Sequence, residues 1–116
     1  MDIDRLFTYP KMFGNDLLLI GNYNKVDIFN VNKGFTLQSI KTCDKYVMNR
    51  FLILNENHFI CGDNAGNIYV FEVDNESIKM KNKFKAHEKL IEGLEKYKDN
   101  IIITCSNDDV KFWEIL

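Results

Sequence analysis

Short apolar runs alternate with polar turns along the chain, and one of these runs recurs at a spacing of 42 residues. Val26–Val31 returns as Ile68–Val73 and again as Val110–Ile115. A second set precedes them, and we expect it to keep the same register: Leu17–Ile20, Phe59–Gly62 and Ile101–Thr104. Unbroken runs of Ile, Val, Leu and Phe are typical of strands buried on both faces. The chain is therefore predicted to repeat one unit of β-strands three times.

Each unit is predicted to hold up to four short strands. The first strand is weakly defined, at 5–9, 47–54 and 90–96. The second and third strands are the apolar runs, at 16–21, 58–62 and 100–105 and at 26–31, 67–73 and 110–115. Asn, Asp and Gly, which tolerate the positive φ of tight hairpins, lie between these two strands at 23–25, 64–66 and 107–109. A period of roughly 40–45 residues with several strands per unit indicates a β-propeller array.

A fourth strand is expected at 35–40 and at 77–85, where apolar and polar residues alternate. In the second of these, Ile78, Met80 and Phe84 are expected on one face. The other face is expected to carry four lysines: Lys79, Lys81, Lys83 and Lys85. Lysines on an outer strand blunt its edge against unwanted pairing. The alternative is a surface that contacts phosphate groups.

The segment 88–98 competes with the strand prediction, because Leu90, Ile91, Leu94 and Tyr97 would share one side of a helix. The 42-residue register favours a strand, since it places Leu90 and Leu94 opposite Met48 and Leu52.

The fold prediction is an all-β, partial β-propeller of three antiparallel blades, the last incomplete, in a single domain spanning 1–116. The units run approximately from 2 to 43, from 44 to 85 and from 86 to 116. Closed propellers usually have about 4–8 blades, so three interpretations stay open. The chain is a fragment, or it completes a propeller with another chain or with copies of itself, or it stays open within a larger assembly.

Composition and charge narrow the function classes. The net charge is -2, which gives no global field for nucleic acid or an anionic membrane. No apolar run approaches the roughly 18 residues of a membrane helix, and Met1–Asp4 lacks the features of a signal peptide. The three cysteines, Cys43, Cys61 and Cys105, have no metal-like spacing and indicate reduced thiols. We therefore expect an intracellular protein, cytoplasmic or nuclear, with no membrane contact.

The third unit resembles the WD40 repeat family. It carries Ala86-His87 near its start, then Thr104-Cys105-Ser106-Asn107-Asp108-Asp109, then Val110-Lys111-Phe112-Trp113-Glu114-Ile115. These segments are similar to the family's Gly-His, Ser-x-Ser-x-Asp and Ile-x-x-Trp-Asp. The second unit, from Cys61 to Glu72, is a looser copy, and the first is looser still. The resemblance implies a WD40-like propeller.

In that family a His, a Ser or Thr, a turn Asp and the strand Trp form a hydrogen-bonded group that tightens a blade. The resemblance assigns these roles to His87, Ser106, Asp108 and Trp113, with Asn107 as a substitute for Asp108 because the turn is about one residue short. Units one and two carry Phe29 and Phe71 in place of the Trp and no matching His. Phe has no N–H to donate, so the network is expected only in the third unit.

No arrangement of residues predicts catalysis, a metal, a cofactor or a small-molecule substrate. Asp108-Asp109 is the one close carboxylate pair near a turn, and its expected role is turn chemistry. His58 and His87 are expected at opposite ends of their blades.

The predicted function is a non-catalytic, protein-binding scaffold within a larger complex. In the family, partners bind the face formed by the loops that lead into each blade and by the turns between second and third strands. The resemblance places partner-binding candidates there: Tyr23, Lys25, Lys45, Tyr46, Asn64, Lys89 and Asn107. The alternative is a component of an RNA-containing particle that contacts phosphate through Lys79, Lys81, Lys83 and Lys85.

Overall fold

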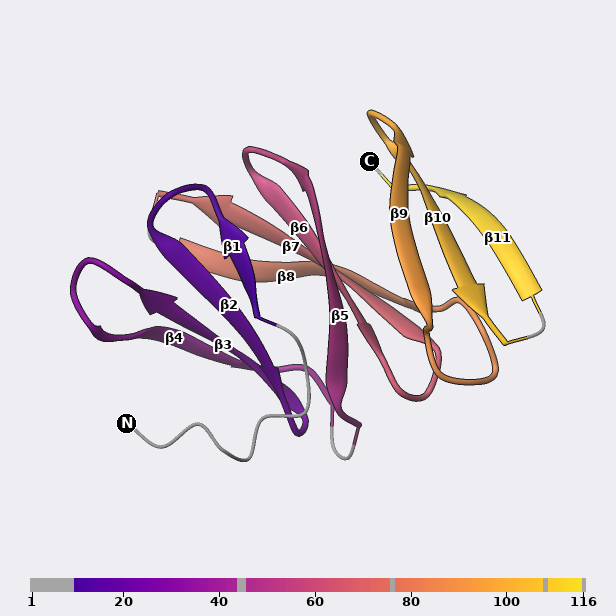
Figure 1. The fold of residues 1–116 in the computed structure, drawn as a ribbon, viewed down its shortest axis with the longest axis horizontal. Helices are drawn as coiled ribbons and strands as arrows, with labels where there is room; N and C mark the ends of the chain where they lie inside the picture. Colours follow the sequence, from indigo (N-terminus) through magenta and orange to yellow (C-terminus); the bar gives the residue numbers. More distant parts are fainter. Residues whose placement is uncertain (1–9, 44–45, 76, 108, 116) are drawn as a thin grey trace.

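In this computed structural model, residues 10–43, 46–75, 77–107 and 109–115 are described, and they form three antiparallel sheets arranged as a fan (Figure 1). Each sheet is one blade, and its strands lie in chain order. Blade 1 comprises β1 (Lys11–Phe13), β2 (Leu17–Asn22), β3 (Lys25–Asn30) and β4 (Phe35–Lys41). Blade 2 comprises β5 (Met48–Asn55), β6 (His58–Asp63), β7 (Asn67–Asp74) and β8 (Ser77–Lys85). Blade 3 comprises β9 (Gly93–Lys98), β10 (Ile101–Ser106) and β11 (Asp109–Glu114).

The predicted fold class is confirmed: the chain is all-β and forms part of a propeller, with three strands in its last blade among the described residues. The helix considered for 88–98 does not form, because 93–98 pairs with β10 as β9. The first predicted strand, at 5–9, lies outside the described residues, and β1 occupies the first position of blade 1. Nowhere in the described part of the chain is there a helix long and apolar enough to cross a membrane.

Two apolar cores lie between the blades. The first core joins blades 1 and 2, where Leu19 and Ile28 pack with Phe59 and Phe71. The rings of Phe59 and Phe71 are stacked with their centroids 4.8 Å apart. The second core joins blades 2 and 3, and Ile60, Ile68 and Val70 of blade 2 meet Ile102 and Trp113 of blade 3. β6 and β7 are therefore buried on both faces, as their unbroken apolar runs predict.

The repeat register differs from the prediction in the second strand of blade 2. β3, β7 and β11 keep the 42-residue spacing, because the equivalent residues Phe71 and Trp113 both face the preceding blade. β6 lies 41 residues after β2, and β10 lies 43 residues after β6. The cause is the hairpin turn, which has three residues in blade 2 (64–66) and two in blades 1 and 3. Since side chains alternate with period two, a shift of one residue exchanges the faces of a strand.

The four lysines of β8 do not share one face, contrary to the alternating pattern. A β-bulge interrupts the pairing of β7 with β8 between Val70 and Phe71. As a result Lys79 pairs with Glu72 on the side of blade 3, whereas Lys83 pairs with Tyr69 on the side of blade 1. Phe84 is likewise turned away from Ile78 and packs against Trp113, at 4.8 Å between ring centroids. An inserted residue on one strand of a pair reverses the alternation beyond it.

Candidate interaction surface at the turn rim

In blades 1 and 2 the turn between the second and third strands contacts the loop that leads into the next blade, and these turns and loops lie along one edge of the fan, at the bottom of Figure 1. We call this edge the turn rim. Between blades 1 and 2, Asn24 N donates to Tyr46 O at 2.7 Å, and Tyr23 forms a β-bridge with Val47. Asn64 N donates to Val47 O at 3.1 Å, and Val47 N donates to Asn64 Oδ1 at 3.3 Å. The structure therefore brings Tyr23, Tyr46 and Asn64 into one cluster.

Between blades 2 and 3 the contact depends on Gly66. Its carbonyl oxygen accepts hydrogen bonds from Ala86 N at 2.8 Å and from His87 N at 3.1 Å. Gly66 has φ of +91°, and a Cβ at this position would lie 1.9 Å from the carbonyl oxygen of His87. Only glycine allows this backbone conformation and this approach.

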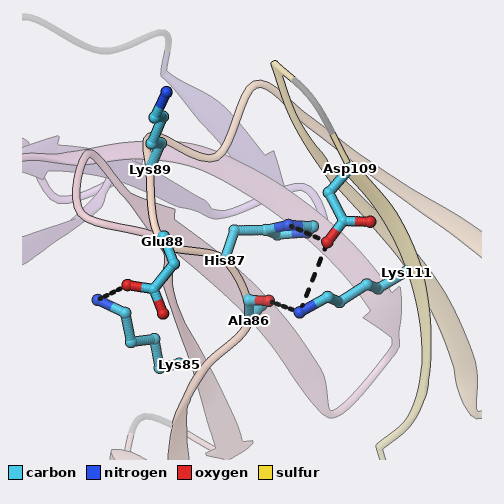
Figure 2. Close-up of a pocket in the computed structure, with 7 residues that line it drawn as sticks. All are labelled: Lys85, Ala86, His87, Glu88, Lys89, Asp109 and Lys111. Atoms are coloured by element: carbon cyan, nitrogen blue, oxygen red, sulfur yellow. Dashed lines mark hydrogen bonds and ion pairs between the residues drawn. The ribbon is translucent and has the colours of Figure 1, made fainter.

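A polar pocket of about 340 Å³ opens beside this contact, as Figure 2 shows. Lys85 lies 3.9 Å from Glu88 and Lys111 lies 3.7 Å from Asp109, as ion pairs. The Lys111 Nζ also donates to Ala86 O at 2.9 Å. Lys89 lines the pocket as well. The pocket walls carry charges of both signs, and such a surface suits polar contacts at the edge of a protein interface.

The other partner-binding candidates occupy the same rim or lie beside it. Tyr23 is the most exposed aromatic residue of the turn rim, at 50%. Lys25 follows the first turn and lies 3.9 Å from Asp27. Asn107, in the turn of blade 3, accepts a hydrogen bond from Ser106 Oγ at 3.5 Å. Lys45 lies outside the described residues.

The hydrogen-bonded group of blade 3 forms around a different hydroxyl from the one assigned by resemblance. Trp113 Nε1 donates to Thr104 Oγ1 at 2.9 Å, and His87 Nε2 lies 2.7 Å from the same oxygen. Trp113 pairs with Ile102, so Thr104 lies two residues further along β10 on the same face. Ser106 lies four residues beyond Ile102, about 13 Å along the strand, which is beyond the reach of the Trp113 indole. Thr104 and not Ser106 therefore holds the Trp, and Asp108 lies outside the described residues.

The shared hydroxyl joins His87 to Trp113. The indole N–H can only donate, so the Thr104 oxygen accepts from it and retains its own proton for donation. His87 Nε2 is the second partner of this oxygen, at 2.7 Å. Nδ1 is buried, has no hydrogen-bond partner among the described residues, and lies 3.9 Å from Asp109 Oδ2. His87 is thus a structural link between the rim and the core of blade 3.

Blade 2 has a polar network that the sequence analysis did not predict. The fully buried Asp63 carboxylate accepts hydrogen bonds from Ala65 N and Asn67 N, both at 2.9 Å, from Asn67 Nδ2 at 2.9 Å, and from the Tyr69 hydroxyl at 2.6 Å. Burial, together with the hydrogen bond to Asp63, holds the pKa of Tyr69 far above its usual value. The signal in the sequence was an Asp directly before the turn Asn64-Ala65-Gly66, a position where Asp side chains bond to backbone amides two residues on.

Two further kinds of chemically reactive side chain, His58 and the three cysteines, lie among the described residues. His58 Nδ1 lies 3.0 Å from Asn55 Oδ1, and its Nε2 lies 3.7 Å from Glu72. Cys43, Cys61 and Cys105 are free thiols, and burial raises the pKa of the Cys61 thiol well above its usual value. Within the described ranges, no three His, Cys, Asp or Glu side chains gather as they would to hold a metal ion.

No protein-family model and no curated protein sequence matches this chain. Solved structures do match its fold. A chain of the Mitotic Checkpoint Complex aligns with a TM-score of 0.76 at 19% identity, over 90% of this chain and 32% of that chain. The computationally designed Ika8 protein aligns with a TM-score of 0.74 at 21% identity, over the same two shares. The chain thus spans about a third of the length of these proteins, and the likeness shows a shared β-propeller architecture.

Proposed function

We propose that this protein is a non-catalytic, WD40-type interaction scaffold that binds other proteins through the turn rim within an intracellular complex. The cluster of Tyr23, Tyr46 and Asn64 carries this proposal. A β-bridge from Tyr23 to Val47 and backbone hydrogen bonds at Tyr46 and Asn64 hold the backbone of all three residues, so little backbone entropy is lost when a partner binds. Tyrosine is also among the residues most enriched at the energetic centres of interfaces. The mixed charges of the pocket at Lys85 and Lys89 supply a polar margin.

A quantitative pull-down tests the proposal. The 116-residue chain and its Tyr23→Ala variant are immobilised on separate supports and exposed to the same cell lysate. The proteins that each support captures are then quantified. We expect Tyr23→Ala to lower the recovery of at least one protein by tenfold or more, since a hot-spot residue contributes about 2 kcal/mol or more. Met80→Ala, an exposed apolar residue on β8 away from the rim, is the matched control and should change nothing. Equal recoveries from all three chains would refute the turn rim as the interface.

Binding of RNA phosphates through the β8 lysines is the second candidate function. The exposure of the Lys79, Lys81 and Lys85 side chains, at 65%, 48% and 50%, favours it. Their division between two faces of the blade weakens it, and so does Glu72, which lies 3.9 Å from both Lys79 and Lys81. A phosphate contact requires affinity for single-stranded RNA that falls steeply with salt. An affinity that is undetectable at low salt, or that does not change with salt, would remove this candidate.

A further inference from the structure

The fan ends in two sheet faces that no other described blade covers. On blade 3, the face turned away from blade 2 carries Tyr97, Val110 and Phe112, which are 54%, 61% and 59% exposed. Tyr97 and Phe112 meet edge-to-face at 5.5 Å between ring centroids, and Ile103 pairs with Phe112 on the same side. We call this surface the blade-3 open face. Large side chains gathered in this way indicate an interaction surface.

The blade-3 open face is built like the interface inside the molecule. In the repeat register of the structure, Ile103, Val110 and Phe112 are equivalent to Ile60, Ile68 and Val70 of blade 2. Those three residues are 0%, 0% and 1% exposed, because blade 3 packs against them. The blade-3 open face therefore carries the same kinds of side chain as the face of blade 2 against which blade 3 packs.

The opposite end of the fan carries the complementary surface. On blade 1, the face turned away from blade 2 includes Met12, Leu18 and Phe29, which follow one another across β1, β2 and β3. We call this surface the blade-1 open face. Met12 is 41% exposed. Val31, which directly follows β3, is 45% exposed. In the repeat register, Leu18 and Phe29 are equivalent to Phe59 and Phe71, the stacked pair that blade 2 presents to blade 1.

The charged residues beside the two faces sum to net charges of opposite sign. The cross-strand pairs place Glu95, Glu114 and Lys98 on the side of the blade-3 open face, for a net charge of -1. The same reasoning places Lys25, Lys41 and Asp27 on the side of the blade-1 open face, for a net charge of +1. Opposite potentials around an apolar centre favour contact between the two faces and disfavour contact of either face with itself.

We propose that a second copy of this chain docks head to tail, with the blade-3 open face of one copy packed against the blade-1 open face of the next. The contact would repeat the sheet packing that joins blades 1 and 2 and blades 2 and 3. It is heterologous, so it covers every open face when the ring closes and extends as a filament when it does not. The surface is separate from the turn rim, so loss of partner binding at the rim leaves this inference intact.

A mixing experiment separates this geometry from any other association. Variant X carries Val110→Glu and Phe112→Glu, and variant Y carries Met12→Glu and Val31→Glu. All four residues are exposed in the single chain, so both variants should fold, which circular dichroism checks. Light scattering should give wild-type chain a mass of at least twice the 13.7 kDa of one copy, and X and Y alone a mass of one copy. An equimolar mixture of X and Y should give a dimer, because one intact face of each kind remains.

Other outcomes overturn the proposal. A wild-type chain that stays at 13.7 kDa at every concentration measured would show that a second copy does not cover the faces. Wild-type oligomers that survive in X or in Y would mean that a face pairs with itself or that another surface associates. A mixture of X and Y that stays monomeric would also contradict head-to-tail docking. Met80→Glu, an equivalent change at an exposed apolar residue outside both faces, should retain the wild-type mass.

Discussion

Thr104 joins two parts of blade 3 through one oxygen atom. It accepts the indole proton of Trp113 on β11 and lies 2.7 Å from His87 in the loop that leads into the blade. Thr104 is fully buried, so no water replaces its hydroxyl when it is removed. A buried donor that loses its partner costs more free energy than the bond itself contributed.

Thr104→Val, which keeps the shape and removes the hydroxyl, should therefore lower the free energy of unfolding by about 1–3 kcal/mol. Chemical denaturation of both proteins measures the difference. Ser106→Ala is the matched control, and its effect should stay below about 1 kcal/mol because Ser106 makes one long bond to Asn107. A larger loss for Ser106→Ala than for Thr104→Val would restore Ser106 to the role that the family resemblance gave it.

Tyr69 makes the stability of blade 2 sensitive to alkaline pH. Because its pKa is raised in the folded chain, the folded state keeps the hydroxyl protonated at a pH where the unfolded chain, with a pKa of about 10, has lost the proton. The stabilisation is therefore complete below pH 10 and is lost as the pH rises above it. The slope contributed by this one group is about 1.4 kcal/mol per pH unit.

We expect the free energy of unfolding to fall above about pH 10 with this slope, added to what the buried Cys61 thiol and the exposed lysines and tyrosines contribute. Tyr69→Phe should remove the added slope, although it lowers stability at neutral pH because Asp63 loses a donor. Denaturation curves of the two proteins between neutral and alkaline pH make the comparison. Parallel curves would show that Tyr69 ionises as readily in the folded chain as in the unfolded one.

At the scale of elements, the contact between blades 2 and 3 depends on the conformation of one turn. Gly66→Ala places a Cβ against the backbone of His87 and also strains φ at +91°. We expect a loss of about 3 kcal/mol or more, since steric displacement adds to the roughly 1–2 kcal/mol of conformational strain. Gly34→Ala is the control: its φ of +70° carries similar strain, but no atom lies within 4 Å of the added Cβ. Equal losses in thermal or chemical unfolding would show that the approach to His87 does not matter.

The elements also show what the sequence could predict. The three blades, their strand order and the third-strand register all follow from the recurrence of Val26–Val31. Only the second strand of the second unit departs from the expected register, by one residue, because runs such as Leu17–Ile20 and Phe59–Cys61 are apolar at every position. A one-residue shift leaves their hydrophobic match unchanged while it exchanges their faces.

Turn length and bulges are set by contacts that no local pattern reveals. The β8 lysines were assigned to one face because alternation alone contains no sign of the bulge opposite Val70 and Phe71. In the same way the sequence marks Asp63 only as a polar residue before a turn, which is a common position for Asp. Its burial, and its bond to Tyr69, become visible only when the blades are in place.

For the whole molecule, the number of neighbouring blades packed against each blade determines the order in which the blades unfold locally. Blade 2 is covered on both faces, by blade 1 through the first core and by blade 3 through the second. Among the described residues, blades 1 and 3 each have one open face, and in blade 3 that face exposes Tyr97, Val110 and Phe112. In arrays of repeats, stability is the sum of each unit's own stability and that of its contacts with neighbours. The central blade, with two such contacts, should therefore open last.

Native-state hydrogen exchange tests this order. In the monomeric variant X, amides of β6 and β7 should exchange slowest, with free energies of opening close to that of global unfolding, and amides of β9–β11 should exchange earlier. Ile102→Ala, which weakens the second core, should speed exchange in blade 3 and leave β2 and β3 nearly unchanged. Phe59→Ala, its counterpart in the first core, should have the reverse preference. If both substitutions speed exchange equally in every strand, the three blades unfold as one cooperative unit, and the open faces do not set their order.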